Sequence, residues 1–409
     1  MRVGIISFHS FYQPGGVKRH ILGLSKELKK RGVYSKIIAP RRNRQEFYGK
    51  DIILLGTSFP ISFSGSQSDF GINFNPLAVE KILKKEKFDI LHFHNFGLPS
   101  TIQILVSPAL SNTLNILTFH SDIKGSKFLK RFPFFFKLVE KVIRWKIDGI
   151  IGVAKLNLEP FKKYQGPKII IPNGIDLEEF NPGVSKIKKF QDGKLNILFV
   201  GRIEKRKGLI YLLKAYEVLT KKYSPPPNFG GGLRLIVVGE GPLKKECQNF
   251  VKKHNLKEVY FEGEIEGPEL PPYYASSDIF VSPAIFGESF GLVLLEAMAS
   301  GLPIVAFANR GYKTFLKDKK GGKFLARPRD WRALAKKIEI LIKNKNLRKE
   351  IGDWGVKEAQ NYSWSKICEQ VLDFYQLCLK EKQKRKGAKP FSLEKSIYKI
   401  INKILSKAF

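Results

Sequence analysis

The chain has 409 residues, of which 43% are hydrophobic and 12% aromatic, as in a folded globular protein. Because this length exceeds one ordinary hydrophobic core, we expect two domains of roughly 200 residues each. Lys and Arg total 72 against 37 Asp and Glu, and the formal net charge of +35 predicts an anionic partner: nucleic acid, a membrane surface or a phosphorylated substrate.

The cysteines and the apolar stretches restrict the compartment. Cys247, Cys368 and Cys378 form no CxxC pair and no metal-ligand spacing, which favours a reducing compartment. Residues 1–8 form a short apolar run rather than a signal peptide, and no stretch approaches the roughly 18 apolar residues of a spanning helix. We therefore expect a cytoplasmic protein that is peripheral at the inner face of a membrane.

The first half of the chain predicts alternating strands and helices. The apolar run Arg2–Phe8 is typical of a buried parallel strand, Gly15-Gly16 turns the chain, and helical apolar spacing continues to Gly32. This is the opening of a Rossmann-like unit, although the G-x-G-x-x-G dinucleotide fingerprint is absent. Further strands are expected at Tyr34–Ala39, Asp51–Leu55, Asp89–Phe93, Asn115–Phe119 and Gly149–Val153.

Histidines stand at the ends of two of these predicted strands. His92 and His94 close one strand, and His120 follows another. Open α/β sheets bind ligands beyond the carboxyl ends of their strands, so His120 is the strongest functional candidate of the three. A structural role is the alternative for each.

The segment 127–146 combines aromatic residues with Lys and Arg. Such a basic aromatic helix suits an anionic membrane surface. A core helix with a solvated basic rim is an equal alternative.

A second α/β series follows a turn at Pro172–Asp176 and a polar linker at Asn181–Gly193. Two of its strand ends carry glycines, at Gly201 and Gly239. Arg202 and Lys207 would bring two cations near a helix N-terminus, which suits a diphosphate. Ordinary surface charge in a Lys-rich protein is the alternative. The strands are expected at Leu195–Val200, Arg234–Val238, Val259–Phe261, Asp278–Val281 and Pro303–Phe307.

The segment Ser282–Pro303 runs from a glycine-containing loop into a helix-period apolar pattern. Gly287 and Gly291 precede the helix, whose free backbone N–H groups and positive dipole end would attract a phosphate. Glu288 lies before that site and Glu296 about two helical turns beyond it. These carboxylates could grip the two ends of a nucleotide-sugar, or they could be solvated glutamates of an ordinary strand-to-helix turn.

The C-terminal region predicts two helical segments. One runs from Ser363 to about Lys380. In segment 393–409, apolar residues share one face and Lys recurs at every fourth position, which is typical of a basic amphipathic helix at an anionic membrane. Packing on the protein body or on a partner helix is the alternative.

Six motifs occur in order along the chain. They are Pro14-Gly-Gly-Val17, His120-Ser-Asp122, Ile171-Pro-Asn-Gly-Ile-Asp176, Gly201-Arg202 with Lys207-Gly208, Gly239-Glu-Gly-Pro242 and Glu288-x7-Glu296. Together they resemble the retaining GT-B glycosyltransferases of glycosyltransferase family 4. The resemblance covers Met1 to about Lys380 and is strongest to the phosphatidyl-myo-inositol mannosyltransferase branch.

The resemblance implies an α/β fold of two Rossmann-like, doubly wound domains that face a cleft. The N-terminal acceptor domain would span residues 1–185 and the nucleotide-sugar domain residues 186–362. A helix at 363–385 would return to the N-terminal domain, and an amphipathic helical tail would occupy 386–409.

The resemblance also implies roles for individual residues. Arg202 and Lys207 would neutralise the leaving diphosphate, Glu288 would hold the sugar hydroxyls, and His120 would face the reacting carbon. The catalytic residues would be His120, Arg202, Lys207 and Glu288. The donor-binding residues would be Gly15, Gly16, Gly201, Gly239, Ile265, Ser289, Phe290, Gly291, Leu292 and Glu296. The acceptor-side residues would be His9, Lys18 and Asp122.

Within those sets the resemblance implies that Glu296 binds the ribose hydroxyls and that Ile265 lines the base pocket. The chain contains no Asp-x-Asp, so we expect neither a metal-bridged diphosphate nor any cofactor beyond the donor. Retention of the anomeric configuration would follow front-face attack rather than a pair of carboxylates as in retaining glycosidases.

The chain departs from the family pattern in two places. Asn309–Thr314 stands where the usual Gly-Gly-x-x-Glu would be, as in the branch it resembles. His9, Lys18 and Gly97 occupy places where the inositol-lipid enzymes carry Tyr, Gln and Asn, so a different acceptor is conceivable.

Several alternatives stay open. GDP-mannose is the favoured donor, with UDP-glucose and UDP-N-acetylglucosamine next. A membrane-associated lipid or lipid-linked saccharide is the favoured acceptor, bound with an anionic membrane surface through 127–146 and 393–409; a soluble sugar or glycan is the alternative. From another class, the +35 charge allows a basic nucleic-acid-binding protein, although no specific nucleic-acid signature occurs. A third possibility is an inactive transferase that serves as a membrane scaffold.

Overall fold

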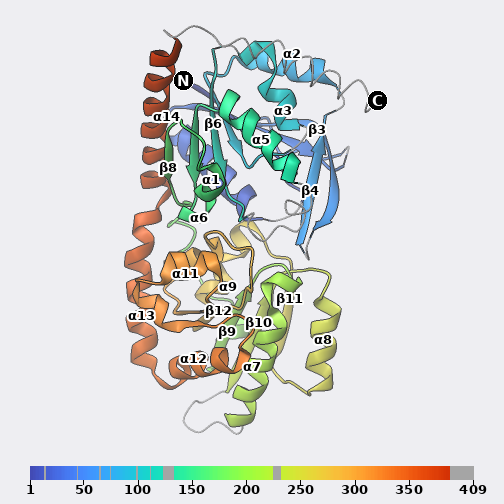
Figure 1. Cartoon of the computed structure of the whole chain (residues 1–409). Coiled ribbons are helices and arrows are strands. Elements are labelled where there is room, and N and C mark those ends of the chain that lie inside the picture. Colours follow the sequence, from blue (N-terminus) through green and yellow to red (C-terminus); the bar gives the residue numbers. More distant parts are fainter. Residues whose placement is uncertain are drawn as a thin grey trace.

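A computed structural model describes residues 1–12, 15–43, 45–63, 66–73, 75–97, 100–110, 112–122, 133–223 and 232–386. The described residues form two stacked α/β domains, each around a largely parallel sheet, with a long C-terminal helix along the side of the N-terminal domain (Figure 1). The predicted fold of two Rossmann-like domains is therefore confirmed. The predicted tail at 386–409 and the first part of the segment 127–146 lie outside the described residues, apart from Lys386 itself.

The N-terminal sheet has eight strands in the order β4-β3-β2-β1-β5-β6-β7-β8. Its described pairings are parallel, except that β3 and β4 form an antiparallel hairpin. The strands are β1 (Arg2–Ser7), β2 (Tyr34–Arg41), β3 (Ile52–Phe63), β4 (Ser66–Ile72), β5 (Ile90–His94), β6 (Leu114–Phe119), β7 (Gly149–Gly152) and β8 (Lys168–Ile170). The helices are α1 (Gly16–Lys30), α2 (Pro76–Glu86), α3 (Ser100–Leu105), α5 (Pro133–Lys146) and α6 (Lys155–Leu158).

The C-terminal sheet has six parallel strands in the order β11-β10-β9-β12-β13-β14. The strands are β9 (Leu195–Val200), β10 (Leu233–Val238), β11 (Val259–Gly263), β12 (Ile279–Ser282), β13 (Ile304–Phe307) and β14 (Leu325–Ala326). The helices are α7 (Leu209–Lys222), α8 (Lys244–Lys253), α9 (Pro271–Ala275), α10 (Leu292–Ala299), α11 (Arg310–Leu316), α12 (Trp331–Lys343) and α13 (Lys345–Ala359).

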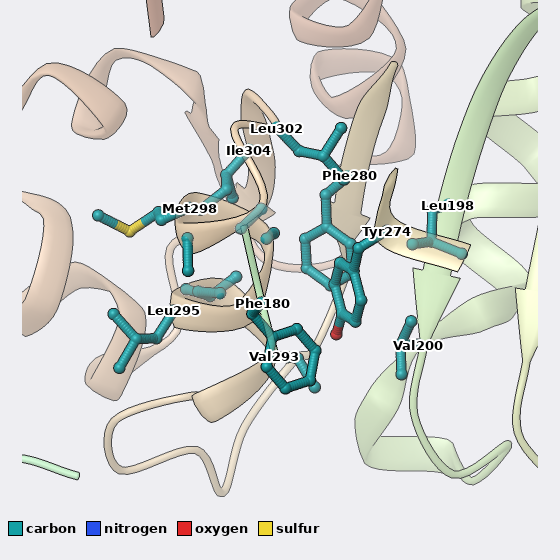
Figure 2. Close-up of a cluster of buried hydrophobic side chains, with 14 of the residues drawn as sticks. Phe180, Leu198, Val200, Tyr274, Phe280, Val293, Leu295, Met298, Leu302 and Ile304 are labelled. Carbon is teal, nitrogen blue, oxygen red and sulfur yellow. The ribbon is translucent and has the colours of Figure 1, made fainter. Parts of the chain in front are cut away.

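The C-terminal sheet buries apolar side chains on both faces, as parallel sheets do. On β9, Leu198 and Val200 belong to one hydrophobic cluster, whereas Ile197 and Phe199 belong to another. Figure 2 shows the first cluster, where Tyr274 and Phe280 pack beside residues of α10. All eight residues of α10 are buried, which fixes this helix firmly at the cleft.

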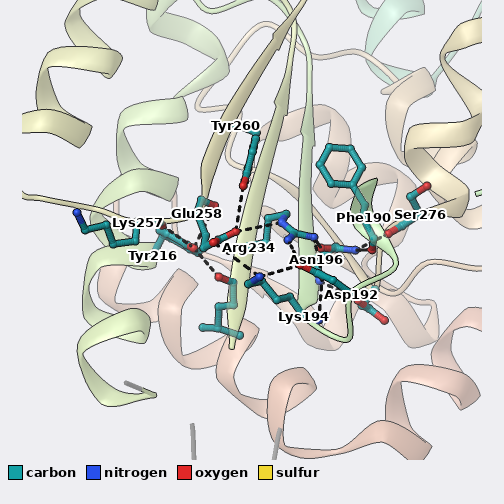
Figure 3. A network of polar contacts seen from close by, with 12 residues as sticks. Phe190, Asp192, Lys194, Asn196, Tyr216, Arg234, Lys257, Glu258, Tyr260 and Ser276 are labelled. Carbon is teal, nitrogen blue, oxygen red and sulfur yellow. Dashed lines mark hydrogen bonds and ion pairs between the residues drawn. The ribbon is translucent and has the colours of Figure 1, made fainter. Parts of the chain in front are cut away.

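A polar network lies at the amino ends of β9 and β10 (Figure 3). Arg234 on β10 is 2% exposed and donates to Asp192 at 2.5 and 3.0 Å, and it also donates to Glu258 at 3.3 Å. Hydrogen bonds from Arg234 and Lys194 lower the pKa of Asp192. A buried guanidinium needs such partners, so we interpret the network as structural. Its residues Asp192, Arg234 and Glu258 do not line the cavity described below.

The predicted strand positions agree with the structure, but three strands were missed. β4 lacks a continuous apolar run, β8 has only three residues and β14 only two. β3 also extends well beyond the apolar run that predicted it, because antiparallel pairing with β4 satisfies the backbone of its second half.

The helix α14 (Trp364–Lys386) packs into the core of the N-terminal sheet. Ile367, Val371 and Phe374 are buried there against β1 and α1 residues. The chain passes between the domains twice, near Ile175 and near Trp364, and the two segments lie side by side. Ile175 N–H donates to the carbonyl of Tyr362 at 2.8 Å, and Trp364 N–H donates to the carbonyl of Ile175 at 3.2 Å. Among the described residues, no helix is both long and apolar enough to cross a membrane.

The described part of the segment 127–146 is α5. Val142 and Ile143 are buried in the core of the N-terminal domain, while Lys141 and Arg144 are exposed. This part of the segment therefore follows the interpretation of a core helix with a basic rim.

Candidate active site

A cavity of about 450 Å³ lies between the two domains. The start of α1 lines it from the N-terminal domain with Gly15, Gly16, Lys18 and Arg19. The C-terminal domain contributes residues that follow β9, β10 and β11, together with α10. These positions are the carboxyl ends of parallel strands, where open α/β sheets bind ligands. The C-terminal lining includes Gly201, Arg202, Lys207, Gly239, Glu240, Ile265, Glu266, Leu292 and Glu296.

Two glycines bring backbone close to this cavity where a side chain would not fit. A Cβ on Gly239, at φ 138°, would lie 2.1 Å from the carbonyl oxygen of Gly201. A Cβ on Gly291, at φ 88°, would lie 2.4 Å from the ring of Tyr312. Gly291 is the N-cap of α10, so the helix begins at the cavity border. Glycine is therefore required at both positions, because the backbone has a positive φ and packs closely against other parts of the domain.

A cluster of charges lies beside the cavity after β9. Lys207 Nζ lies 2.7 Å from Glu288 Oε1, and Arg206 donates to the same oxygen at 2.9 Å. Arg206 Nε also lies 2.5 Å from Glu204, which is 3.7 Å from Arg202. These contacts with Glu204 are ion pairs rather than well-aligned hydrogen bonds.

Burial and mutual attraction shift the pKa values of the two partners of the Lys207–Glu288 ion pair. Burial lowers the pKa of Lys207, and the charge of Glu288 offsets part of this effect. Burial opposes ionisation of Glu288, but the charges of Lys207 and Arg206 outweigh it and lower the pKa of this carboxyl. Glu288 is therefore an anion held by two cations, which disfavours its action as a free nucleophile.

Glu296 on α10 is 1% exposed and has partners from both domains. Tyr274 donates its hydroxyl to Glu296 Oε2 at 2.7 Å. Arg19 on α1 contacts Glu296 Oε1 across the cleft. Burial raises the pKa of Tyr274 well above its ordinary range, so this phenol stays a donor.

Four histidines gather where α1 packs on the carboxyl ends of β5 and β6: His20 on α1, His92 and His94 on β5, and His120 after β6. His94 Nδ1 and His120 Nε2 are 3.0 Å apart, and His92 bonds the Tyr375 hydroxyl and Thr118 at 2.6 Å each. The ring of His20 lies 4.8 Å from that of His120. Burial lowers the pKa of His20 to about 4 and that of His92 to about 3. Burial also lowers the pKa of His94 and of His120 well below their ordinary value, so the cluster is neutral at pH 7.

Among the described residues, His20, His94 and His120 form a group whose ring nitrogens are close enough to be tested as metal ligands. One ring nitrogen from each of His20, His94 and His120 lies within 4.8 Å of the others. A tetrahedral zinc site, with Zn–N about 2.0 Å, needs nitrogens roughly 3.3 Å apart. The His94–His120 contact is instead a direct hydrogen bond between two ring nitrogens, 3.0 Å apart, which leaves no room for an ion between them.

Further polar contacts join the domains around the cleft. Arg310 on α11 donates to Asp122 at 3.1 Å and also contacts Glu159. Asn157 donates to Ser289 at 3.2 Å. Lys18 on α1 pairs with Glu266 of the C-terminal domain at 3.1 Å.

The structure brings together ten of the predicted site residues as cavity lining. They are Gly15, Gly16, Lys18, Gly201, Arg202, Lys207, Gly239, Ile265, Leu292 and Glu296. The other predicted residues lie outside this lining, although Glu288 contacts Lys207. The side chain of Phe290 packs on Phe315, with ring centroids 4.6 Å apart. The residues outside are His9, His120, Asp122, Glu288, Ser289, Phe290 and Gly291.

Sequence reasoning missed three arginines. Arg206 stood within a recognised motif but received no role, and neither Arg19 nor Arg310 was singled out. Helical spacing was one available signal, since Arg19 follows the cavity-lining Gly16 by three residues and so faces the same side. For Arg310 the sequence carries no such signal, because its partners lie in the other domain.

Solved structures share this architecture over nearly the whole chain. Sucrose-phosphate synthase from Thermosynechococcus elongatus matches with a TM-score of 0.70 at 20% identity, over 92% of this chain and 98% of its own. Anabaena HepE, solved with UDP and glucose, matches with a TM-score of 0.71 at 17% identity, over 92% and 99%. The fold is that of the GT-B glycosyltransferases.

Sequence comparisons define the family. The model for glycosyl transferases group 1 matches residues 183–357, and the model for glycosyltransferase family 4 matches residues 14–179. The phosphatidyl-myo-inositol mannosyltransferase of Propionibacterium freudenreichii is 30% identical over 92% of this chain and 94% of its own length. That of Mycobacterium leprae is 29% identical over 92% and 96%. The Arabidopsis thaliana sulfoquinovosyl transferase is 27% identical over 78% of this chain and 62% of its own.

The chain is thus a GT-B hexosyltransferase. It belongs to glycosyltransferase family 4 and is similar to the phosphatidyl-myo-inositol mannosyltransferases, which confirms the resemblance drawn from its motifs.

Proposed function

We propose that the protein transfers a hexose, with mannose from GDP-mannose as the first candidate, to a membrane-associated lipid or lipid-linked saccharide, with retention of configuration. The observation that carries this proposal is the cavity where Gly16, Arg202, Lys207 and Glu296 meet. A glycine backbone, two cations and a buried carboxylate match the parts of a nucleotide diphosphate sugar.

The donor would be held by both walls of this cavity. Arg202 and Lys207 bind the diphosphate, aided by the N-terminus of α10 and by the backbone at Gly16. Ribose hydroxyls donate to Glu296, and the base lies against Ile265. Each contact follows from the residue type and from its place in the cavity lining.

The chemistry would be stabilisation of the leaving diphosphate. Negative charge grows on its bridging oxygen as the bond to the anomeric carbon breaks, and fixed cations beside it lower the barrier. Glu288 holds the sugar hydroxyls while Lys207 and Arg206 keep it ionised. His120, neutral and held by His94, faces the reacting carbon. The acceptor enters on the same face as the leaving group, near His9, Lys18 and Asp122.

The cations also explain why no metal would be needed. Metal-dependent transferases neutralise the diphosphate with a divalent ion, whereas here two basic side chains and a helix N-terminus supply that charge. We therefore propose transfer without a metal.

The acceptor proposal rests on the relatives and on charge. Relatives at 29% and 30% identity are named for an inositol-lipid acceptor, and the +35 charge suits an anionic membrane surface. The segment 393–409, with Lys at every fourth position, would bind that surface at the cytoplasmic face.

The test is thermal stabilisation by a panel of nucleoside diphosphates in EDTA, with wild type and Arg202→Ala. Lys205→Ala is the matched control, because Lys205 is exposed and lies outside the cavity lining. We expect GDP to stabilise wild type and the control, and Arg202→Ala to lose the effect.

Selective stabilisation by UDP would replace mannose with a UDP-sugar and keep the mechanism. Stabilisation by none of the nucleotides would contradict the transferase proposal and favour a scaffold or nucleic-acid-binding role.

A further inference from the structure

Arg19 is the basic residue that links the two walls of the cleft directly at the proposed ribose site. It lies in the first turn of α1, three residues after Gly16, and its side chain contacts Glu296 on α10. Both Arg19 and Glu296 line the cavity. Their contact therefore crosses the space that the proposed function gives to the donor.

Both carboxylate oxygens of Glu296 are engaged by protein side chains. Tyr274, which is buried behind it, donates to Oε2 at 2.7 Å, and Arg19 contacts Oε1 from the cavity side. An ionised carboxylate that is 1% exposed needs such partners. A ribose hydroxyl that approaches from the cavity meets Arg19 before it reaches Oε1.

Arg19 differs from its basic neighbours in what holds it. Lys207 and Arg206 are anchored by Glu288, which lies outside the cavity lining. Arg19 contacts the very carboxylate that the ribose needs, and 37% of its side chain is exposed. Removal of Glu296 as a partner would leave its charge facing the cavity.

We propose that Arg19 is a donor-binding residue that exchanges partners. In the free protein it neutralises Glu296; when a nucleoside diphosphate enters, ribose hydroxyls take its place and its guanidinium turns to the diphosphate. This inference rests on the proposed function. The planar fork of Arg suits two phosphate oxygens, and Gly16, one helical turn away, lines the same cavity.

The exchange predicts opposite effects of Arg19 on the affinities for a nucleoside and for its diphosphate. Arg19 competes with the ribose hydroxyls for Glu296, but its guanidinium binds the phosphates. Loss of Arg19 should therefore strengthen the binding of a nucleoside and weaken the binding of the corresponding diphosphate. A merely structural role for Arg19 would change both affinities in the same direction.

The experiment compares wild type with Arg19→Gln by calorimetry, or by ligand-observed NMR for weak ligands. Guanosine with GDP, and uridine with UDP, are the probes, all in EDTA. Arg31→Gln is the control, because it removes the same charge from the C-cap of the same helix, outside the cavity lining. Arg19→Lys keeps the charge without the fork and provides a second variant if Arg19→Gln folds poorly.

We expect the preference for diphosphate over nucleoside to fall by about 10-fold or more in Arg19→Gln, as loss of a charged hydrogen bond implies. Arg19→Lys should show a smaller loss, and Arg31→Gln should match wild type. An unchanged or increased preference in Arg19→Gln would overturn the inference while wild type still binds diphosphates. If wild type binds no diphosphate, the proposed function itself fails, and the inference fails with it.

Discussion

The two walls of the cleft are built from different chemistry. The C-terminal wall is dense in charge, with Arg206 and Lys207 gathered around the buried anion Glu288. The N-terminal wall is backed by a neutral histidine cluster, of which His20 and His94 are buried. The cations of the C-terminal wall are held by carboxylates of their own domain, whereas Lys18 and Arg19 of the N-terminal wall pair with carboxylates across the cleft.

The contrast indicates how work is divided between the domains. Fixed charge stabilises a diphosphate as it leaves, and it acts best where partners hold it in place before the reaction. The neutral rings of the histidine cluster carry no charge that would compete for that diphosphate. We therefore expect changes to Arg202 and Lys207 of the C-terminal wall to act mainly on rate, and changes to the histidine cluster of the N-terminal wall to act mainly on stability.

The largest effect is expected for Lys207→Ala. Loss of one preorganised charge from a developing anion costs about 10²–10³-fold in kcat. Lys205→Ala, which removes an exposed Lys from the same short segment, should stay near wild type. Steady-state kinetics with saturating donor decides the matter, and equal kcat in the two variants would remove Lys207 from the proposed mechanism.

A large loss of stability is expected at low pH, because His20 in the N-terminal wall is buried. His20 has a pKa of about 4 in the fold against 6.5 when unperturbed, because burial disfavours its charged form. Between these values the unfolded chain binds more protons, so the free energy of unfolding falls as pH drops from about 6.5 to 4. The shift corresponds to roughly 3 kcal/mol for this group.

Urea unfolding of wild type and His20→Gln at pH 7 and pH 4.5 measures this effect. The variant should lose less stability on acidification than wild type does. His254→Gln changes a partly exposed histidine outside the cluster and serves as the control. Equal pH dependence in wild type and His20→Gln would show that protonation of His20 is not linked to unfolding.

The smallest effect is expected for Arg310→Gln. Arg310 pairs with Asp122 and Glu159 across the domains but is 34% exposed, and such pairs contribute at most about 1 kcal/mol. We expect a loss of free energy of unfolding below about 1 kcal/mol and a few-fold rise in the acceptor KM. Lys313→Gln, an exposed change on the same helix, is the control. A drop in kcat as large as that of Lys207→Ala would contradict a role of Arg310 limited to holding the two domains together.

The sequence predicted the two sheets and most of the donor side for a physical reason. Parallel strands are continuous apolar runs, and their ends meet at one edge of the sheet, so motifs such as Gly201-Arg202 and Gly239 had to converge. The helix α10 could also be placed, because its apolar pattern begins directly after Gly291.

The remaining features depend on which surfaces meet across the cleft. The contacts of Arg19 with Glu296 and of Arg310 with Asp122 join residues 277 and 188 positions apart, and local patterns do not encode such pairs. The hairpin partner β4 was missed because antiparallel pairing, rather than an apolar run, holds it. His9 and Asp122, both predicted for the acceptor side, lie outside the cavity lining, so the acceptor path is a proposal that sequence motifs alone could not locate.

The most direct measurement is the identity and anomeric configuration of the product formed in EDTA. GDP-mannose and vesicles that contain phosphatidylinositol would be incubated with wild type, and the product analysed by mass spectrometry and NMR. We predict one added hexose in the same α configuration as in the donor. An inverted product, or transfer that requires a divalent metal, would contradict leaving-group stabilisation by Arg202 and Lys207 with front-face attack.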